Sequence, residues 1–447
     1  MATSQPVVGV ATFSLPRERT DLAERFHTQA VEGLRGSGLE VVSSEELVFS
    51  EADAVKTAQA LASQKADCIL YLMGTWVFCP AVVSALESVS LPSGIWANAD
   101  PASFSLTAGG IVHGSLDELG LVHRFIYGAP GEARTLNEVA TFARAARVVT
   151  RLKGTRLGLI GGRVMGMYTT QVDTAQIKDT FGVELEHIDS LCQYLEAEQA
   201  DADAVARELE TLRARFGTIA VDDERLDRSI RVYLALRKII HDGGYDFAAV
   251  KCQGAMIDTY ACSCLAASLI NDEGMVLACE SDVNAALTMQ MLKLASGTSP
   301  IVFGDINHVD RQRKVLRIVN CGSMPSLLAP APKEVELQSQ YEYMGKAGGA
   351  TVVLCCKAGP VTLARLSRIK GQYVMLIAQG NAVERPKEQF REARDRWPHL
   401  FVELDGDPEL LLQNVRSNHL HACYGHWTQE LEVVCDLLRI KPIIIRS

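Results

Sequence analysis

The sequence lacks the patterns that identify nucleic-acid-binding, secreted and membrane proteins. Acidic residues outnumber basic ones by 54 to 44, and no stripe of Lys and Arg marks a nucleic-acid surface. The first residues show no basic region ahead of an apolar run, so they do not resemble a signal peptide. No apolar segment reaches the roughly 20 residues that a membrane-spanning helix needs. We therefore expect a cytoplasmic protein with neither a nucleic-acid nor a membrane partner.

Cysteine motifs are also missing, although the chain has 12 cysteines. They are scattered through apolar segments, which is typical of reduced, buried thiols in a cytosolic enzyme rather than of a disulfide framework. One residue separates Cys262 from Cys264, and Cys355 directly precedes Cys356, so neither pair has the CxxC spacing of a zinc site. The sequence therefore does not favour metal binding by cysteine.

Several catalytic signatures are missing as well. The chain contains no GxSxG nucleophile elbow, no Walker loop and no HExxH helix. Residues 161–166, GGRVMG, follow an apolar segment but lack the GxGxxG spacing of a dinucleotide site. We interpret them as a tight turn.

Alternating apolar and amphipathic segments predict the fold class. At 447 residues the chain is too long for one compact core. Residues 1–152 and 153–297 each alternate continuous apolar strands with helical patterns, which predicts two Rossmann-like, doubly wound α/β domains. Residues 298–447 show short strands joined by Gly-containing turns, which predicts an antiparallel β domain or partial barrel.

Two carboxylates follow apolar strands in the middle of the chain. Glu280 follows GMVLAC, and Asp305 ends PIVFGD. We expect both at the ends of neighbouring parallel strands, where open α/β sheets bind their ligands. A carboxylate there needs a compensating cation, proton or donor. With one late histidine among His419, His421 and His426, the set would suit Mn²⁺ or Mg²⁺ better than structural zinc.

Other polar side chains at predicted strand ends have both a structural and a functional interpretation. Arg17 and Arg19 follow the first strand, and Trp76 follows the third. The arginines are consistent with solvated surface charges and the tryptophan with packing, but their edge of the sheet also binds ligands. Gln253 ends the strand before Glu280, where it would cap a turn or bind a substrate hydroxyl. Three further acids are interpreted as caps or surface charges without a role: Asp258, Asp272 and Asp282.

Taken together, these segments resemble the L-fucose isomerase family and its L-arabinose isomerase-like relatives. The segments KCQG, ACESDVNAALTMQML, PIVFGDINHVD, IVNCGS and SNHLHACYGHW occur in the order of that family. The similarity extends over nearly the whole chain. It implies two Rossmann-like domains and an antiparallel β domain, assembled as a homo-oligomer, a hexamer or a trimer, with sites near subunit interfaces.

The resemblance also implies an activity and a site. It implies an aldose–ketose isomerase that acts on an open-chain sugar through a cis-enediolate, with Mn²⁺ as cofactor and Mg²⁺ or Co²⁺ as substitutes. The implied metal ligands are Glu280, Asp305 and His419, with Glu280 as principal base and Asp305 as acid/base partner. The implied substrate contacts are Gln253, Asn320, Ser323, Trp76, Arg17 and Arg19.

The identity of the sugar stays open, because the chain is shorter than typical L-fucose isomerases and its carboxyl domain lacks pocket-shaping insertions. A pentose, a 6-deoxyhexose and a substituted sugar all remain candidates. Two alternative functions also stay open. One is a non-catalytic sugar-binding protein, and the other is an epimerase or aldolase that uses the same metal site.

Overall fold

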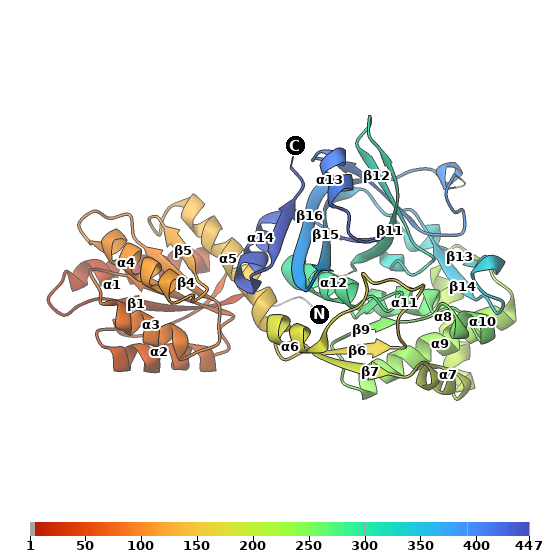
Figure 1. The fold of residues 1–447 in the computed structure, drawn as a ribbon, viewed down its shortest axis with the longest axis horizontal. Coiled ribbons are helices and arrows are strands. Elements are labelled where there is room, and N and C mark those ends of the chain that lie inside the picture. Colours follow the sequence, from red (N-terminus) through yellow and green to blue (C-terminus); the bar gives the residue numbers. More distant parts are fainter. Residues whose placement is uncertain (1–4, 298–299, 391, 447) are drawn as a thin grey trace. The chain divides into compact units, whose positions relative to one another are not determined.

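The computed structural model describes residues 5–297, 300–390 and 392–446. These residues form two compact units (Figure 1). The first unit holds the chain up to Arg151 and the later segment Gln429–Arg439. The second holds Leu152–Thr428 and the chain from Ile440 onward. The expected division into three domains, with boundaries after residues 152 and 297, stays a prediction.

The first unit is built on a parallel sheet. Its strand order is β2-β1-β3-β4-β5, and all neighbours pair in parallel. Every residue of β1 and β3 is buried, which explains why these segments are continuous apolar runs rather than alternating ones. The strands are β1 (Val7–Phe13), β2 (Glu40–Ser43), β3 (Cys68–Met73), β4 (Ser93–Ala97) and β5 (Arg124–Tyr127). The helices are α1 (Thr20–Gly36), α2 (Glu51–Ser63), α3 (Cys79–Glu87), α4 (Ser105–Glu118), α5 (Ala133–Leu152) and most of α14 (Thr428–Leu438).

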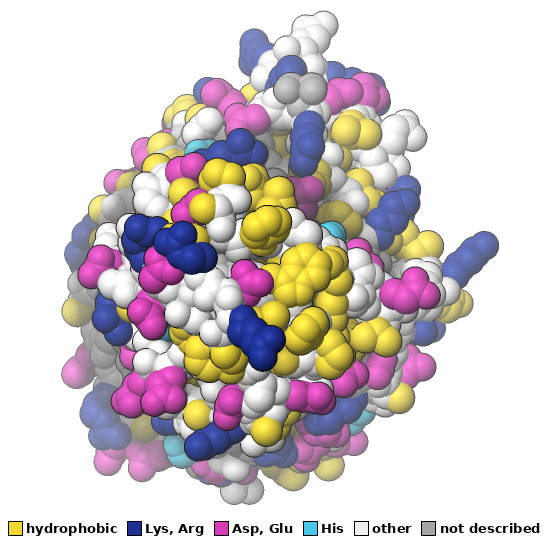
Figure 2. All heavy atoms as spheres, turned by 90° about the vertical axis from the view of Figure 1, so that its left-hand side faces the viewer, with side chains coloured by type: hydrophobic (Ala, Val, Ile, Leu, Met, Phe, Trp, Pro, Cys, Tyr) yellow, Lys and Arg dark blue, Asp and Glu magenta, His cyan; other side chains and the backbone are white. Residues whose placement is uncertain are grey.

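Exposed hydrophobic side chains are present on the first unit. Figure 2 shows hydrophobic side chains gathered on the face of this unit that is turned to the viewer. The exposed large side chains of the unit include Phe78, Phe104 and Leu106. Among the described residues, no helix combines the length and the apolar character that crossing a membrane requires.

The second unit begins with another parallel sheet, in the order β10-β9-β6-β7. Its strands are β6 (Arg156–Ile160), β7 (Glu184–Ile188), β9 (Phe247–Val250) and β10 (Val276–Ala278). Its helices are α6 (Thr174–Phe181), α7 (Ser190–Glu198), α8 (Ala202–Arg215), α9 (Asp223–Asp242), α10 (Ala255–Thr259), α11 (Cys264–Asp272) and α12 (Val283–Ser296). A small sheet joins β8 (Thr218–Ala220) to β13 (Glu336–Ser339) and β14 (Ala350–Val353).

The rest of the second unit is an antiparallel barrel. Six strands pair in the order β15-β18-β11-β12-β17-β16, and β16 pairs back with β15 to close the ring. The strands are β11 (Val302–Asp310), β12 (Val315–Val319), β15 (Gly359–Ile369), β16 (Gln372–Val383), β17 (His399–Leu404) and β18 (His419–Tyr424). Strand β19 (Lys441–Ile444) adds to β16 in parallel. The remaining helices are α13 (Pro408–Asn414) and the 3₁₀ turns Ser326–Leu328, Pro332–Glu334, Glu342–Met344 and Lys387–Gln389.

Helix α12 joins the parallel sheet of the second unit to the barrel. It packs against β9 and β10 on one side and against β15 and β18 on the other (Figure 1). Nearly every side chain of α12 is buried, which explains its almost unbroken apolar sequence. The predicted fold class is confirmed: parallel α/β sheets come first in the chain, and a closed antiparallel barrel of six strands follows.

Candidate metal and catalytic site

The turn between β10 and α12 places the first carboxylate. Glu280 and Ser281 both have a left-handed backbone, with φ of 59° and 49°. Each non-glycine residue in this region costs about 1–2 kcal/mol, so the surrounding structure has to hold it there. The Ser281 amide donates to the Val250 carbonyl oxygen at 3.0 Å, and Asp282 caps α12 by accepting from the Ala285 amide at 2.9 Å. Consecutive left-handed residues of this kind are found at functional sites.

The pairing of two barrel strands places the other two groups. Strands β11 and β18 are antiparallel, and their register sets Asp305 directly opposite His419. Directly opposed residues on one face have Cβ atoms about 5 Å apart, so their polar ends can share one ligand. The pairing of β11 with β12 shifts register between Ile306 and His308, directly after Asp305. Such irregularities often lie next to active sites, where they redirect a side chain.

Glu280, Asp305 and His419 therefore converge, although they come from three segments. The distance from His419 Nε2 is 3.0 Å to Glu280 Oε2 and 3.6 Å to Asp305 Oδ1. One ligand atom from each of the three side chains lies within 4.8 Å of the other two. His419 is fully buried and Glu280 is buried, whereas Asp305 is half-buried. The sequence prediction was wrong about Asp305 in one respect, because it lies inside an antiparallel strand and not at the end of a parallel one.

Asp282 and Arg365 form a buried support beneath the three side chains. His419 Nδ1 donates to Asp282 Oδ2 at 2.6 Å. The Arg365 guanidinium donates to both Asp282 oxygens, at 2.7 and 3.3 Å, and both side chains are almost completely buried. A buried ion pair of this geometry fixes the carboxylate, and the carboxylate in turn fixes the imidazole ring. Only Nε2 of His419 is left to face Glu280 and Asp305.

Burial and close charges shift the pKa values of these groups. Burial alone would lower the pKa of His419, but its hydrogen bonds to Asp282 and Glu280 raise it to about 10. Burial raises the pKa of Asp305 to about 6, and the nearby Glu280 charge adds to this effect. Burial would also raise the pKa of Asp282, but Arg365 and His419 outweigh it and lower that pKa. A cluster of three acids therefore retains a cation, which is the His419 proton when no other cation is bound.

The donor set fits a divalent metal ion. Two carboxylates and one imidazole nitrogen leave positions open for further oxygen ligands, an arrangement that suits Mn²⁺ or Mg²⁺. The contact between His419 Nδ1 and Asp282 is the outer hydrogen bond that orients a metal-binding histidine. Ser281 Oγ and Asn320 Nδ2 are among the buried polar atoms of the second unit that have no hydrogen-bond partner. A buried amide N–H without a partner is costly, so a ligand oxygen is a natural acceptor for it.

The other predicted substrate contacts lie in two places. In the second unit, Asn320 Oδ1 accepts from the amides of Gly322 and Ser323 and from Ser323 Oγ, so this turn is fixed and its Nδ2 is left over. Gln253 is half-buried beyond β9. The first unit holds half-buried Trp76, exposed Arg17 and exposed Arg19. Their predicted contact with substrate, in the same or a neighbouring subunit, stays a prediction.

Sequence reasoning missed Asp282 and Arg365. Asp282 does cap a helix, as expected, but it is not a surface charge, because its side chain is fully buried. Its partner Arg365 lies 83 residues away in an apolar strand. An arginine inside the apolar run PVTLARLSRI was the available signal, since a fully buried arginine is almost always paired. Of the other histidines, His421 is buried beside Arg365 and His426 is exposed.

Comparisons with known proteins point to one family. Residues 318–446 match the family model described as "L-fucose isomerase, C-terminal domain". Sulfoquinovose isomerase from Alkalicoccus urumqiensis is 27% identical over 376 residues, which cover 82% of this chain and 84% of that protein. The enzyme of the same name from Priestia megaterium is 24% identical over 385 residues, 84% of each chain. A third, from Clostridium sp., is 26% identical over 331 residues, 71% of this chain and 70% of that protein.

Solved structures give a much weaker likeness. A solute-binding protein of an ABC transporter from Burkholderia multivorans has a TM-score of 0.19 and 16% identity, covering 65% of this chain and 94% of that chain. One from Actinobacillus succinogenes, with bound D-allose, has a TM-score of 0.19 and 13% identity over 66% and 94% of the two chains. Structures this different do not indicate the fold or the function of the chain.

Proposed function

We propose that this chain is an aldose–ketose isomerase of the L-fucose isomerase family, because residues 318–446 match the model of that family's C-terminal domain. Glu280, Asp305 and His419 would hold a divalent metal ion, preferably Mn²⁺, with Mg²⁺ or Co²⁺ as substitutes. The observation that carries the proposal is the convergence of these three side chains. His419 Nε2 lies 3.0 Å from Glu280 Oε2 and 3.6 Å from Asp305 Oδ1. The Asp282–Arg365 pair supports it, because a carboxylate that is itself held by an arginine orients the ring of a metal-binding histidine.

The two carboxylates divide the proton transfers of the reaction. When bound, the metal ion would polarise the oxygens on C1 and C2 of the open-chain sugar. Glu280 would remove the C2 proton to give the cis-enediolate, and Asp305 would move the hydroxyl proton and help return a proton to C1. Asp305 Oδ1 accepts from Asn418 Nδ2 at 2.7 Å, which orients this carboxylate for that exchange.

Two buried polar groups would orient the sugar. The unpaired Asn320 Nδ2 would donate to a sugar oxygen, because its own Oδ1 is already used to fix the Asn320–Ser323 turn. Ser281 Oγ, buried next to Glu280 in the chain, would accept from or donate to a second hydroxyl. Gln253 would contribute a further amide from the end of β9.

The substrate we propose is an open-chain aldose with sulfoquinovose as the first candidate, since the similar proteins named above carry that name. The sulfonate of this sugar would need cationic partners. Arg17 and Arg19 are exposed cations after β1, although Arg19 already pairs with Asp21 at 2.6 Å. We include them, with Trp76, as groups that would contact the sugar held by a neighbouring subunit.

The proposal includes a homo-oligomer, a hexamer or a trimer. The exposed hydrophobic face of the first unit supports it, since exposed apolar patches commonly mark association surfaces (Figure 2). Light scattering of the purified protein tests this part separately, and a monomer at all concentrations would remove the neighbouring-subunit role of Arg17, Arg19 and Trp76.

The decisive experiment is a metal-restored isomerisation assay. The protein is stripped with a chelator, then given Mn²⁺, Mg²⁺ or Co²⁺ and offered sulfoquinovose, L-fucose, L-arabinose and D-glucose. NMR in D₂O follows the appearance of the ketose and the exchange of the C2 proton. We expect turnover of at least one aldose only with metal, and its loss in Glu280→Gln. Glu388→Gln, a change at an exposed acid of the barrel unit, is the matched control.

Other outcomes of the same assay identify the alternatives. Sugar binding that survives chelation, without turnover of any aldose, would indicate a sugar-binding protein. Cleavage of the carbon skeleton would indicate an aldolase, and inversion at a carbon without movement of the carbonyl group would indicate an epimerase.

A further inference from the structure

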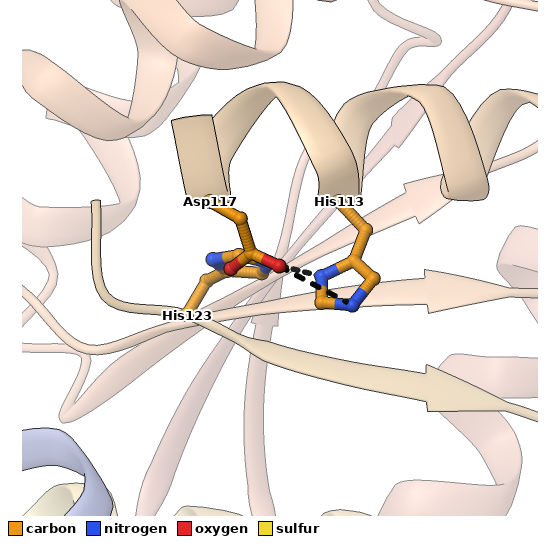
Figure 3. Close-up of side chains that lie close together, drawn as sticks. All are labelled: His113, Asp117 and His123. Carbon is orange, nitrogen blue, oxygen red and sulfur yellow. Dashed lines mark hydrogen bonds and ion pairs between the residues drawn. The ribbon is translucent and has the colours of Figure 1, made fainter. Parts of the chain in front are cut away.

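A second cluster of histidine and carboxylate groups lies in the first unit, at the end of α4. It consists of His113 and Asp117 on the helix and His123 in the segment that leads to β5 (Figure 3). One ligand atom from each side chain lies within 4.8 Å of the other two. Neither the proposed isomerase site nor the family resemblance uses these residues.

The end of the helix explains why the three side chains meet. His113 and Asp117 are four residues apart, so they project from the same face of α4. The helix ends with Gly120 at φ 66°, where the Gly120 amide donates to the Asp117 carbonyl and the Leu121 amide donates to the Leu116 carbonyl. This pair of bonds is a Schellman motif, which reverses the chain. The reversal returns His123 to the face that carries the other two.

Hydrogen bonds and stacking fix both imidazole rings. His123 Nδ1 donates to the Leu121 carbonyl at 2.9 Å, so the lone pair of neutral His123 lies on Nε2. That Nε2 lies 2.6 Å from His113 Nδ1, which must therefore be the donor in the neutral pair. The His113 ring also stacks on Phe125, with centroids 4.9 Å apart and planes 18° apart. A backbone carbonyl that orients the far nitrogen is common for metal-binding histidines.

This arrangement leaves two lone pairs facing each other. With its proton on Nδ1, neutral His113 has its lone pair on Nε2, which lies 3.7 Å from Asp117 Oδ2. Two acceptors at that separation gain nothing from each other until a cation lies between them. Figure 3 shows Asp117 and His123 both directed at the His113 ring. The cluster therefore has donor atoms in place for a cation.

We propose that His113, Asp117 and His123 form a binding site for a transition-metal ion of the Zn²⁺ class. Two imidazole nitrogens and one carboxylate oxygen are a common zinc donor set, and imidazole also suits Co²⁺ and Ni²⁺. Zinc-bound nitrogens stand about 3.3 Å apart in a tetrahedral site. When the ion enters between His113 Nε2 and Asp117 Oδ2, His123 Nε2 therefore leaves the His113 Nδ1–H and turns to the ion.

Access for the ion comes from solvent and from a neighbouring cavity. The side chains of His113 and Asp117 are 42% and 65% exposed. A cavity of about 310 Å³ is lined by Asp117, His123 and residues of the segment between them, together with the end of α14. The fourth coordination position can therefore be filled by water or by a small anion from the cavity.

The test is a count of bound Zn²⁺ by equilibrium dialysis, with Co²⁺ absorption spectra as a second readout. His123→Ala and Asp117→Asn should each lower the Zn²⁺ content by one ion per chain relative to wild type. They should also remove one component of the Co²⁺ spectrum. His187→Ala, at an exposed histidine of β7, is the matched control and should change neither readout. His419→Ala should lose a different ion and keep this one.

The two variants also distinguish loss of the site from loss of the fold. Asp117 is exposed and His123 is half-buried, so neither substitution should disrupt the core. The free energy of unfolding without metal is measured for each variant and for wild type. Equal Zn²⁺ content in wild type and in folded His123→Ala would overturn the proposal, whatever the isomerase assay shows. So would a Co²⁺ spectrum that only His419→Ala changes.

Discussion

The clusters around His419 and His113 use the same kinds of side chain but are assembled in opposite ways. His419 meets Glu280 across 139 residues of sequence, and it needs a strained turn and two barrel strands to do so. His113 meets His123 across ten residues, through one helix end and one glycine. The first cluster depends on tertiary packing, whereas the second is local structure.

Burial separates them further. The His419 side chain has no exposed surface, whereas the His113 side chain is 42% exposed. Burial removes solvent from the buried cluster and leaves its hydrogen bonds and charges poorly screened, and together these effects shift its pKa values strongly. A water-poor site of that kind can move a proton between a carboxylate and a sugar carbon. An exposed trio has the ligands for an ion but not the enclosure that proton transfer from carbon requires.

The largest expected effect is on turnover. Glu280→Gln keeps the shape of the side chain but replaces a basic, negatively charged carboxylate with a neutral amide, so kcat should fall on the order of 10,000-fold. Asp117→Asn changes a carboxylate of the exposed cluster and should leave kcat unchanged within about twofold. Initial rates with the best aldose and saturating Mn²⁺ measure both. Equal losses of kcat in the two variants would show that the two clusters do not differ in their role in turnover.

The second effect concerns the support beneath His419. Asp282→Asn leaves Arg365 buried without its charge partner, which should cost about 3–5 kcal/mol of unfolding free energy in the second unit. It also frees the His419 ring, so Mn²⁺ affinity should fall about 10- to 100-fold. Mn²⁺ titration followed by EPR and denaturant unfolding measure the two consequences.

Asp272→Asn is the matched control for Asp282→Asn. Asp272 is also buried in the second unit, and it accepts from Arg215 at 2.8 Å and from the Leu327 amide at 2.9 Å. Breaking this pair should reduce stability but leave Mn²⁺ affinity at the wild-type value. A similar affinity loss in both variants would show that Asp282 acts only through general stability.

The sequence predicted the fold class and the three converging residues, but not their geometry. Continuous apolar strands between amphipathic helices indicated parallel sheets, and the structure contains them. The resemblance supplied Glu280, Asp305 and His419. The position of Asp305 was wrong because five apolar residues followed by an acid look the same at the end of a parallel strand and within an antiparallel one.

The missed residues have separate physical causes. Asp282 has the sequence position of an ordinary helix cap, and only the fold brings Arg365 to it from 83 residues away. The cluster at the end of α4 was missed although it is local. An i, i+4 pair of His113 and Asp117 is usually a solvated surface pair, and only the left-handed turn at Gly120 gives it a third member.

His399 is a buried histidine whose pKa shows the effect of burial without the hydrogen bonds to carboxylates that His419 makes. It is fully buried in β17, it donates from Nδ1 to the Trp397 carbonyl at 2.9 Å, and it stacks on Phe390. Burial lowers its pKa to about 4. Between about pH 6.5 and pH 4 the unfolded chain binds a proton here and the folded chain does not. Stability should therefore fall as the pH drops through this window, by up to about 3 kcal/mol.

Urea unfolding of wild type and His399→Phe across that window measures this effect. The variant loses one hydrogen bond at every pH, but the difference in stability between the two proteins should shift in its favour as the pH falls. His187→Ala changes an exposed histidine, so its free energy of unfolding should depend on pH in the same way as that of wild type. Parallel curves for wild type and His399→Phe would show that burial alone does not shift this histidine.

The smallest effect tests whether the exposed cluster depends on one turn. Gly120→Ala places a side chain at φ 66°, which should cost about 1 kcal/mol in the stability of α4, even though no atom lies within 4 Å of the added carbon. Gly110→Ala, at an exposed position inside the same helix with equal free space, should stabilise α4 by about 0.5–1 kcal/mol. Hydrogen exchange of the α4 amides measures both the expected loss and the expected gain of helix stability. Because the left-handed turn at Gly120 returns His123 to the face of the helix, only Gly120→Ala should also weaken Zn²⁺ binding. A loss of Zn²⁺ affinity in both variants would mean that helix stability, rather than the turn, holds the cluster together.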